Sequence, residues 1–386
     1  MDVLFVVYQF LVLLAVAGVA GMTLGNAFVM KPLGRYGFKS NFGSNAPLVS
    51  ILVPARNEAA NIRRCVRSLL SQDYRNFELL VLDDGSTDAT ASILQTLHKE
   101  DNTGRLQLLT GESLAEGWLG KNWACHQLSQ QAKGDFLLFT DADTVHGLRA
   151  VTSAVAALQQ EQADLLSVFP RQETQTLAER LVVPLLIMYV MGLLPTWLVK
   201  SNPDPRISAA NGQFMCFRHA MYQQCGGHEA VHNQVLEDVK LGQRVKAIGG
   251  KQILPDGTDS VSCRMYRRQN EVWQGFSKNF YAFFDYNPKW FGLFLGLNVL
   301  AYVGPYFWLL LGWLTAQPQT LGWFWLPLFQ IGLAWLTRLI LAIRWGFRGI
   351  DIFLHPLSIL LMCAIGFNSW RWRRNGTYWK GRIYKN

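Results

Sequence analysis

The sequence predicts an α/β domain with a mostly parallel sheet, held between membrane segments on its N-terminal and C-terminal sides. Half of the 386 residues are hydrophobic and only 16% are charged, below the roughly 25% of an ordinary soluble domain. Residues 3–30 carry no charge, and a second apolar block begins at Trp290. We therefore expect an anchor over residues 1–30, a domain over 45–280, a membrane region over 290–370 and a basic tail over 371–386.

The first apolar segment predicts a retained transmembrane helix. Residues 3–30 are long enough to cross a hydrocarbon core of about 30 Å. No basic residue precedes them, and the run is longer than the apolar part of a cleaved signal peptide. Lys31, Arg35 and Lys39 follow, so the positive-inside rule places this end of the segment in the cytoplasm.

The middle region alternates short apolar runs with helical periodicity. The expected strands are Val49–Pro54, Leu79–Leu82, Leu106–Leu109, Phe136–Phe139 and Leu165–Phe169. Four helices are expected: one capped by Asn57, one that begins near Asp88, and two that cover Lys121–Ala132 and Leu148–Gln160. Strands that alternate with helices indicate a parallel sheet covered on both faces.

Polar clusters follow three of these strands. The first strand ends in Arg56-Asn57-Glu58, the second in Asp83-Asp84-Gly85-Ser86 and the fourth in Asp141-Ala142-Asp143. Ligands of open α/β sheets bind beyond the carboxyl ends of the strands, so the three clusters predict one shared site.

Asp141-Ala142-Asp143 is a DxD motif directly after an apolar strand. Two carboxylates one residue apart can hold Mg²⁺ or Mn²⁺ together with diphosphate oxygens. The alternative is a polar turn whose aspartate caps the next helix. In the second cluster, Thr87 or Asp88 is expected to cap a helix.

The order of the motifs resembles the family 2 glycosyltransferases, which have a GT-A fold. The resemblance rests on the run Val49–Glu58, on the DDGSTD stretch from Asp83 and on the DxD motif. The stretch around Lys121 (GWLGKNWA) resembles the loop that brings a lysine to the donor diphosphate in membrane-bound members. Glu237-Asp238 resembles the ED motif, in which the aspartate is the general base.

The resemblance implies a Rossmann-like GT-A domain, an inverting mechanism and a nucleotide-sugar donor, with a UDP-sugar favoured. It implies these site residues: catalytic Asp238 and Glu237; donor-binding Pro54, Ala55, Arg56, Glu58, Asp83, Asp84, Lys121, Asp141, Arg267 and Trp273; metal-binding Asp143 and Asp141. Asp238 as a surface or helix-capping acid stays open, and so does His146 as a ligand.

The acceptor prediction rests on the region after the ED motif. Processive synthases carry QxxRW there, whereas the run Gln269–Trp273 lacks the arginine. The stretch Tyr266–Asn279 resembles the bacterial carotenoid glycosyltransferases, and the hopanoid-associated glycosyltransferases share much of the pattern. We therefore expect transfer to the hydroxyl of a membrane lipid, with a hydroxylated carotenoid first and a hopanoid, polyprenyl phosphate, sphingolipid or glycerolipid as alternatives. A non-catalytic membrane protein that binds nucleotide sugars is the rival from another class.

Membrane topology is predicted from charge and length. A crossing by Leu181–Val199 would separate Asp143 from Asp238, so this segment is expected to lie in or dip into the interface as part of the central domain. A buried hairpin of the soluble domain stays open as the alternative. Phe291–Trp313 and Trp323–Ile343 are expected to span. Phe353–Phe367 is short and contains His355-Pro356, which favours a re-entrant segment. These expectations give a multi-pass protein of a bacterial inner or plasma membrane, with its catalytic domain and tail in the cytoplasm.

The remaining composition excludes other classes. The net charge of +9 is concentrated in the tail, in Arg371, Arg373, Arg374, Lys380, Arg382 and Lys385. Such a cluster beside an apolar block favours anionic lipid headgroups over nucleic acid. Six cysteines without a CxxC pair indicate a reducing compartment. Three histidines (His219, His228 and His232) lack a fourth ligand at zinc spacing. The sequence leaves the oligomeric state open.

Overall fold

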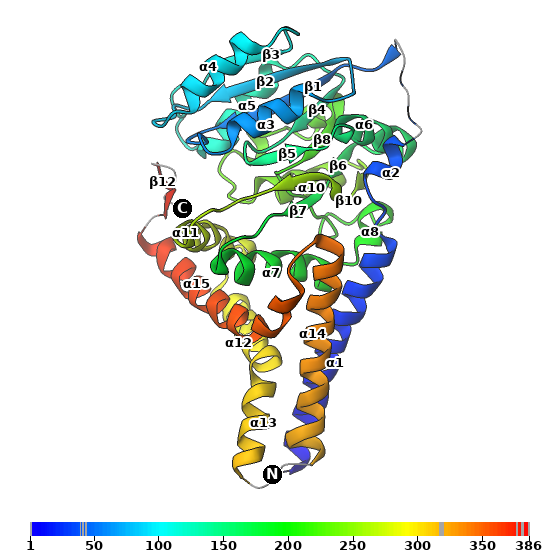
Figure 1. The fold of residues 1–386 in the computed structure, drawn as a ribbon, viewed down its shortest axis with the longest axis vertical. Helices are drawn as coiled ribbons and strands as arrows, with labels where there is room; N and C mark the ends of the chain where they lie inside the picture. The colour runs from blue at the N-terminus through cyan, green and yellow to red at the C-terminus, as the bar shows by residue number, and fades with distance from the viewer. Residues whose placement is uncertain are drawn as a thin grey trace. The chain divides into compact units, whose positions relative to one another are not determined.

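The computed structural model describes residues 2–38, 40, 42, 45–315, 320–375, 377–379 and 382–384, and these form two compact units (Figure 1). The sheet unit comprises Met30–Glu173 and Thr196–Met265. The helical unit comprises Met1–Val29, Thr174–Pro195 and Tyr266–Asn386. The compact units divide the predicted domain range of 45–280 after residues 173, 195 and 265, and the domain bounds themselves stay a prediction.

A seven-stranded sheet forms the centre of the sheet unit, in the order β3-β2-β1-β4-β8-β6-β9. Its strands are β1 Val49–Ala55, β2 Phe77–Asp83, β3 Leu106–Thr110, β4 Phe136–Phe139, β6 Leu165–Ser167, β8 Met215–Arg218 and β9 Gln252–Ile253. β8 runs antiparallel to β4 and β6, and the other neighbours are parallel. The predicted mostly parallel α/β sheet is confirmed, while the antiparallel strand β8 was not predicted from the sequence.

The predicted strand Leu165–Phe169 is wrong in its extent. The chain leaves the main sheet after β6, and β7 Phe169–Gln172 belongs to a second sheet. In this three-stranded sheet β10 Asp256–Cys263 lies between β7 and β5 Thr144–His146. Val168, between β6 and β7, is fully buried, so the change of sheet occurs inside the core.

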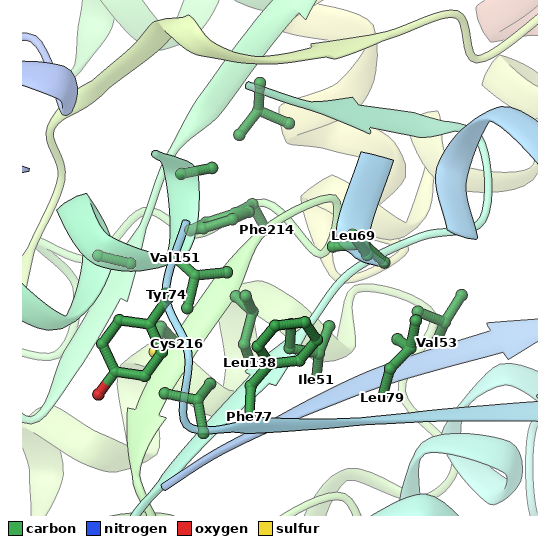
Figure 2. Close-up of a cluster of buried hydrophobic side chains, with 14 of the residues drawn as sticks. Ile51, Val53, Leu69, Tyr74, Phe77, Leu79, Leu138, Val151, Phe214 and Cys216 are labelled. Atoms are coloured by element: carbon green, nitrogen blue, oxygen red, sulfur yellow. The ribbon is translucent and has the colours of Figure 1, made fainter. Parts of the chain in front are cut away.

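Both faces of the main sheet are covered by helices. On one face, strand residues such as Ile51 and Leu79 pack against α3 Ile62–Leu70, α4 Thr90–Glu100 and α6 Ala150–Gln160, and Figure 2 shows part of this cluster. On the other face, Leu52 and Leu80 pack with residues of α5 Gly120–Gln131, α9 His219–Gln224 and α10 Glu237–Ala247. Burial on both faces explains why the strands are continuous apolar runs in the sequence.

The helical unit contains long apolar helices. Its elements are α1 Asp2–Val29, α7 Leu177–Leu193, α11 Gln269–Phe280, η3 Ala282–Phe284, α12 Pro288–Tyr302, α13 Gly304–Leu314, the π-helical turn η4 Leu321–Trp325, α14 Leu326–Trp345, η5 Gly349–Leu354, α15 His355–Asn375 and the hairpin β11 Thr377–Trp379 with β12 Arg382–Tyr384. α1 and α14 pack side by side (Figure 1). By length and composition, Val3–Val29, Leu321–Trp345 and Gly349–Arg373 are candidate membrane spans among the described residues.

Two predictions about the C-terminal helices are wrong in detail. The predicted single span Phe291–Trp313 is divided into α12 and α13, which meet at an angle of 46°. His355-Pro356 does not shorten the last helix, which is helical over Gly349–Arg373. Pro356 lies in the first turn of α15, where its missing N–H breaks no helical hydrogen bond.

The segment Leu181–Val199 is also divided. α7 ends at Leu193, and the short helix α8 Thr196–Ser201 begins after Pro195. α7 accommodates Pro184 in its interior and belongs to the helical unit. Its location in the membrane interface stays a prediction, as does a cytoplasmic tail, of which Lys380 and Lys385 lie outside the described residues.

Candidate active site

The carboxyl ends of three neighbouring strands meet at one edge of the main sheet. Ala55 of β1 lies opposite Asp83 of β2, and Leu52 of β1 lies opposite Phe139 of β4. The polar clusters that follow β1, β2 and β4 therefore leave the sheet at the same edge, as the sequence predicts. The N–H of Asp84 donates to the carbonyl of Ala55 at 2.8 Å, so the first two loops begin in contact.

Asn57 joins the loops after β1 and β2 and does not cap a helix. α3 begins at Ile62, and Asn57 has a left-handed backbone with φ of 54°. Its Oδ1 accepts a hydrogen bond from the N–H of Thr87 at 2.8 Å, and its N–H donates to Oγ of Ser86 at 3.0 Å. The predicted helix cap is wrong because the side chain of Asn57 accepts its hydrogen bond from the neighbouring loop and not from the first turn of α3.

Arg56 and Asp88 add further links between the same loops. The guanidinium of Arg56 donates to the carbonyls of Asp84 and Gly85. The carboxylate of Asp88 accepts from the N–H of Thr90 at 2.9 Å, at the start of α4, and from the N–H of Ala59 at 3.1 Å. Burial opposes ionisation of Asp88, but these hydrogen bonds outweigh it and lower its pKa. Asp88 has the structural role that the sequence predicts.

Lys121 lies in the first turn of α5 and contacts two carboxylates. Its Nζ is 2.9 Å from Oδ1 of Asp141 and 2.9 Å from Oε1 of Glu237. Burial alone would lower the pKa of Lys121, but the two carboxylates raise it well above its usual value. The ammonium therefore stays charged at the sheet edge, between the loop after β4 and the start of α10.

Asp238 is held by two backbone N–H groups. Its Oδ2 accepts from Gly212 at 2.9 Å and its Oδ1 accepts from Val239 at 2.8 Å. Burial and the neighbouring charge of Glu237 raise the pKa of Asp238 to about 6, although Lys121 and the two N–H groups act in the opposite direction. The carboxylate is thus ionised at neutral pH and basic enough to accept a proton.

Lys121, Asp141 and Glu237 line one shallow hollow, and Asp238 lies next to it through its hydrogen bond with Gly212. The hollow is lined by Pro54, Lys121, Cys125, Phe139, Thr140, Asp141, Gly212, Met215, His228 and Glu237. Gly212 is the lining residue that sequence reasoning most clearly missed. A Cβ at this position would lie 2.7 Å from Nζ of Lys121 and 3.7 Å from Oδ2 of Asp238. The Asn211-Gly212 dipeptide, a turn signal, is the clue that could have identified it.

Asp143 faces a different hollow from Asp141. This second, shallow hollow is lined by Asn61, Arg64, Asp143, Thr144, Val145, Glu173, Ser262 and Arg264. The DxD motif thus supplies oxygen donors suited to Mg²⁺ or Mn²⁺. Among the described residues no three His, Cys, Asp or Glu side chains are placed to hold a metal ion by themselves, so a cation here would need phosphate oxygens to complete its coordination. The residues fit a cation that binds together with a diphosphate.

His146 has a structural environment. It is buried, its Nε2 lies 3.0 Å from Oγ1 of Thr140, and its Nδ1 lies 3.3 Å from Oγ of Ser68. Burial lowers its pKa to about 3, so the ring is neutral. Its hydrogen bonds to two hydroxyl groups account for both nitrogens.

Two of the predicted site residues belong to the helical unit. The N–H of Arg267 donates to Oε2 of Glu271 at 2.7 Å, just before α11. Trp273 packs against a hydrophobic cluster that includes Leu181 and Ile365. The predicted roles of all the site residues stay predictions. Of these residues, Pro54, Lys121, Asp141 and Glu237 line one hollow together with Gly212.

The carboxylates and the lysine lie at the carboxyl edge of a mostly parallel sheet, where open α/β domains bind their ligands. The sequence comparison identifies the domain within this chain. Residues 50–197 match the family model described as Glycosyl transferase family 2. This stretch of the chain is therefore a family 2 glycosyltransferase domain.

Individual relatives agree with this assignment. The 4,4'-diaponeurosporenoate glycosyltransferase of Staphylococcus haemolyticus is 26% identical over 238 residues, and the match covers 59% of each protein. The enzyme of the same name from Staphylococcus aureus is 25% identical over 352 residues, which cover 89% of each protein. A mannosyltransferase from Pyrobaculum calidifontis, solved with GDP-Man and Mn²⁺, has the same GT-A fold: its TM-score is 0.54 at 17% identity, over 95% of this chain and 98% of that one.

Proposed function

We propose that the chain transfers a sugar, with inversion, from a nucleotide-sugar donor to a terminal oxygen of a membrane carotenoid. The observation that carries the proposal is the cluster of Lys121, Asp141 and Glu237 beside Asp238, in a family 2 glycosyltransferase domain. One ammonium and several carboxylates at a sheet edge suit a reaction in which a proton leaves the acceptor and a diphosphate leaves the donor.

In the proposed reaction Asp238 acts as the general base. Its carboxylate accepts the proton of the acceptor hydroxyl, and the oxygen forms a bond to the anomeric carbon. The bond from this carbon to the donor diphosphate breaks on the opposite face, and the nucleoside diphosphate leaves with the electron pair. Lys121 donates hydrogen bonds to the leaving diphosphate, while Glu237 holds its ammonium at the sheet edge.

A divalent metal at Asp143 and Asp141 would neutralise charge on the departing diphosphate. Mn²⁺ in the mannosyltransferase of the same fold supports a metal in general, and its GDP-Man supports a nucleotide-sugar donor. Pro54, Ala55, Arg56, Glu58, Asp83 and Asp84 lie in or next to the linked loops after β1 and β2, where they are proposed to contact the nucleoside of a UDP-sugar.

Two oxygen groups are considered for the acceptor. The sequence predicts a hydroxyl group of a carotenoid, whereas the relatives in Staphylococcus are named for diaponeurosporenoate, a carboxylate. A carboxylate is already ionised at neutral pH and needs no base, but a hydroxyl does. The raised pKa of Asp238 suits the hydroxyl acceptor, and the names of the relatives favour the carboxylate.

The apolar helices of the helical unit support a membrane location. We propose that α1 anchors the chain with its N-terminus outside and that the sheet unit lies in the cytoplasm, because Lys31 and Arg35 follow α1. A carotenoid lies within the bilayer, so an enzyme at the membrane surface could reach its terminal oxygen without extracting the chain.

The test is the lipid profile of cells with and without this protein. We expect deletion to convert a glycosylated carotenoid into the free hydroxylated or carboxylated form, which mass spectrometry distinguishes. Loss of a hopanoid or glycerolipid glycoside with intact pigments would refute the carotenoid acceptor. Purified protein that neither transfers the sugar nor hydrolyses a nucleotide sugar would instead support a non-catalytic binding protein.

A further inference from the structure

The helical unit buries an arginine in the middle of a candidate membrane span. Arg338 lies in α14 and is only 5% exposed. Its Nη1 is buried and has no hydrogen-bond partner within the described part of the chain. A guanidinium is always charged in proteins, and a buried charge without a partner is strongly unfavourable. Arg338 therefore requires an anionic group.

The nearby carboxylate is already engaged by another arginine. Asp351, at the start of the helical stretch before α15, is 4% exposed. Nε of Arg180 donates to its Oδ2 at 2.9 Å, and Nη2 of Arg180 donates to its Oδ1. Asp351 also interacts electrostatically with Arg338, but no ion pair joins Arg338 to an acid among the described residues. One carboxylate thus faces two guanidinium groups, which leaves one excess positive charge.

The other polar groups around Arg338 do not supply the missing acceptor. His355 is fully buried, interacts electrostatically with Arg338, and has no partner for either ring nitrogen among the described residues. Its ring contacts Tyr302 at 4.8 Å between ring centroids. Tyr189, the other group that faces Arg338, donates its hydroxyl to Oδ1 of Asn298 at 2.8 Å. The cluster thus offers unused nitrogens of Arg338 and His355 to a ligand.

The outer surface near this cluster is apolar. Leu336, Leu339 and Ile343 of α14 are 43%, 39% and 78% exposed, and Phe353, just before His355, is 50% exposed. A molecule with an anionic head and a hydrocarbon chain offers both chemistries, a negative charge for Arg338 and an apolar chain for these exposed side chains. Ionisable residues inside membrane segments commonly mark ligand sites.

We propose that Arg338 and His355 form a binding site for the carboxylate or phosphate group of an anionic amphiphile. The guanidinium donates to one oxygen through Nη1, and the N–H of His355 donates to the same group. The site lies wholly within the helical unit, and it does not depend on the proposed transfer reaction.

The first test uses the full-length protein, purified in a neutral detergent, and follows thermal unfolding while lipid is added. We compare oleate with methyl oleate and phosphatidylglycerol with phosphatidylcholine at matched concentrations. A ligand that binds only the folded protein raises the unfolding temperature, and at a given concentration the shift increases with the logarithm of its affinity. Stabilisation by oleate alone identifies a carboxylate ligand. Stabilisation by phosphatidylglycerol but not by phosphatidylcholine identifies a lipid phosphate whose charge is not neutralised by a headgroup cation. Equal shifts within both pairs would overturn the proposal.

The second test assigns the effect to Arg338. Arg338→Met should weaken the apparent affinity for the stabilising lipid by about tenfold or more, as expected for the loss of one hydrogen bond to a charged group. Arg348→Met, at an exposed position of the same unit, is the matched control and should bind as the native protein does. Arg338→Lys serves if the methionine variant does not fold, since it keeps the charge and loses the planar fork. Unchanged lipid selectivity in both Arg338 variants would overturn the assignment.

Discussion

The two compact units both gather charged side chains, but they gather them in different ways. In the sheet unit, Asp83, Asp141 and Asp143 lie at or just beyond the ends of β2 and β4. Both strands pair in parallel with β1, and this register alone brings their carboxyl ends to the same edge of the sheet. In the helical unit, Arg180 and Asp351 are far apart in the sequence and meet through helix packing. The first arrangement follows from local sequence patterns, whereas the second requires the tertiary structure.

The sharpest test of the sheet-unit cluster separates its two predicted roles. Asp238→Asn should lower sugar transfer by about 10²–10⁴-fold, the usual contribution of a general base, and leave donor binding largely unchanged. Asp143→Asn should also abolish transfer but weaken metal-dependent donor binding. Steady-state transfer assays and donor titration with and without Mg²⁺ or Mn²⁺ measure both quantities.

Both variants should unfold at the same temperature as the native protein, which serves as the control. Near-normal turnover of Asp238→Asn with a hydroxylated acceptor would remove the base assignment. If Asp238→Asn kept near-normal turnover with a carboxylate acceptor but not with a hydroxylated one, the acceptor would need no base, and the reacting group would be identified as the carboxylate.

Ion pairs in the two units should differ in their importance for stability. Asp351→Asn leaves Arg180 without its carboxylate in a buried setting, and we expect it to lower the free energy of unfolding by about 3 kcal/mol, the lower end for breaking a buried pair. Arg180 retains 19% side-chain exposure, which is why the lower end applies. Asp204→Asn breaks the exposed pair with Arg206 in the sheet unit and should change stability little. Thermal unfolding in detergent compares the two, and equal effects would contradict the distinction.

The sheet and its site edge were predictable, because apolar runs followed by acidic turns are local features. The direction of β8 was not, since Met215–Arg218 is a four-residue strand whose pairing with β4 is set by distant contacts. The role of Asn57 was also missed, because both its backbone φ and its bond to Thr87 depend on the neighbouring loop. Gly212 and Arg338 show the same limit, since only packing reveals what each one contacts.

A pair of glycines provides a smaller test of the same contrast. Gly212→Ala would place a methyl group 2.7 Å from Nζ of Lys121, so the lysine must move from the carboxylates that hold it. We expect transfer to fall by roughly tenfold, as when one hydrogen bond to a charged group is disturbed. Gly332→Ala in α14 meets no atom within 4 Å and should leave transfer unchanged. If both variants retain full activity, the position of Lys121 is not critical.

The smallest expected effect is the pH dependence of transfer. Burial and Glu237 raise the pKa of Asp238 to about 6, and a general base works only when it is unprotonated. Transfer to a hydroxyl should therefore be constant above about pH 7 and should fall to roughly one-tenth near pH 5. Protonation of Asp238 does not cause this loss of activity by unfolding the protein. A carboxyl whose pKa is raised in the folded state stabilises the fold as pH decreases. The stabilisation is complete below the unfolded-state pKa and disappears as pH rises through about 6, opposite to the change in activity.

Asp143→Asn, which keeps Asp238, should show the same midpoint in any residual transfer, and Asp238→Asn should lose it. A profile that is flat from pH 5 to pH 8 would remove Asp238 as the base and leave the carboxylate acceptor as the better explanation.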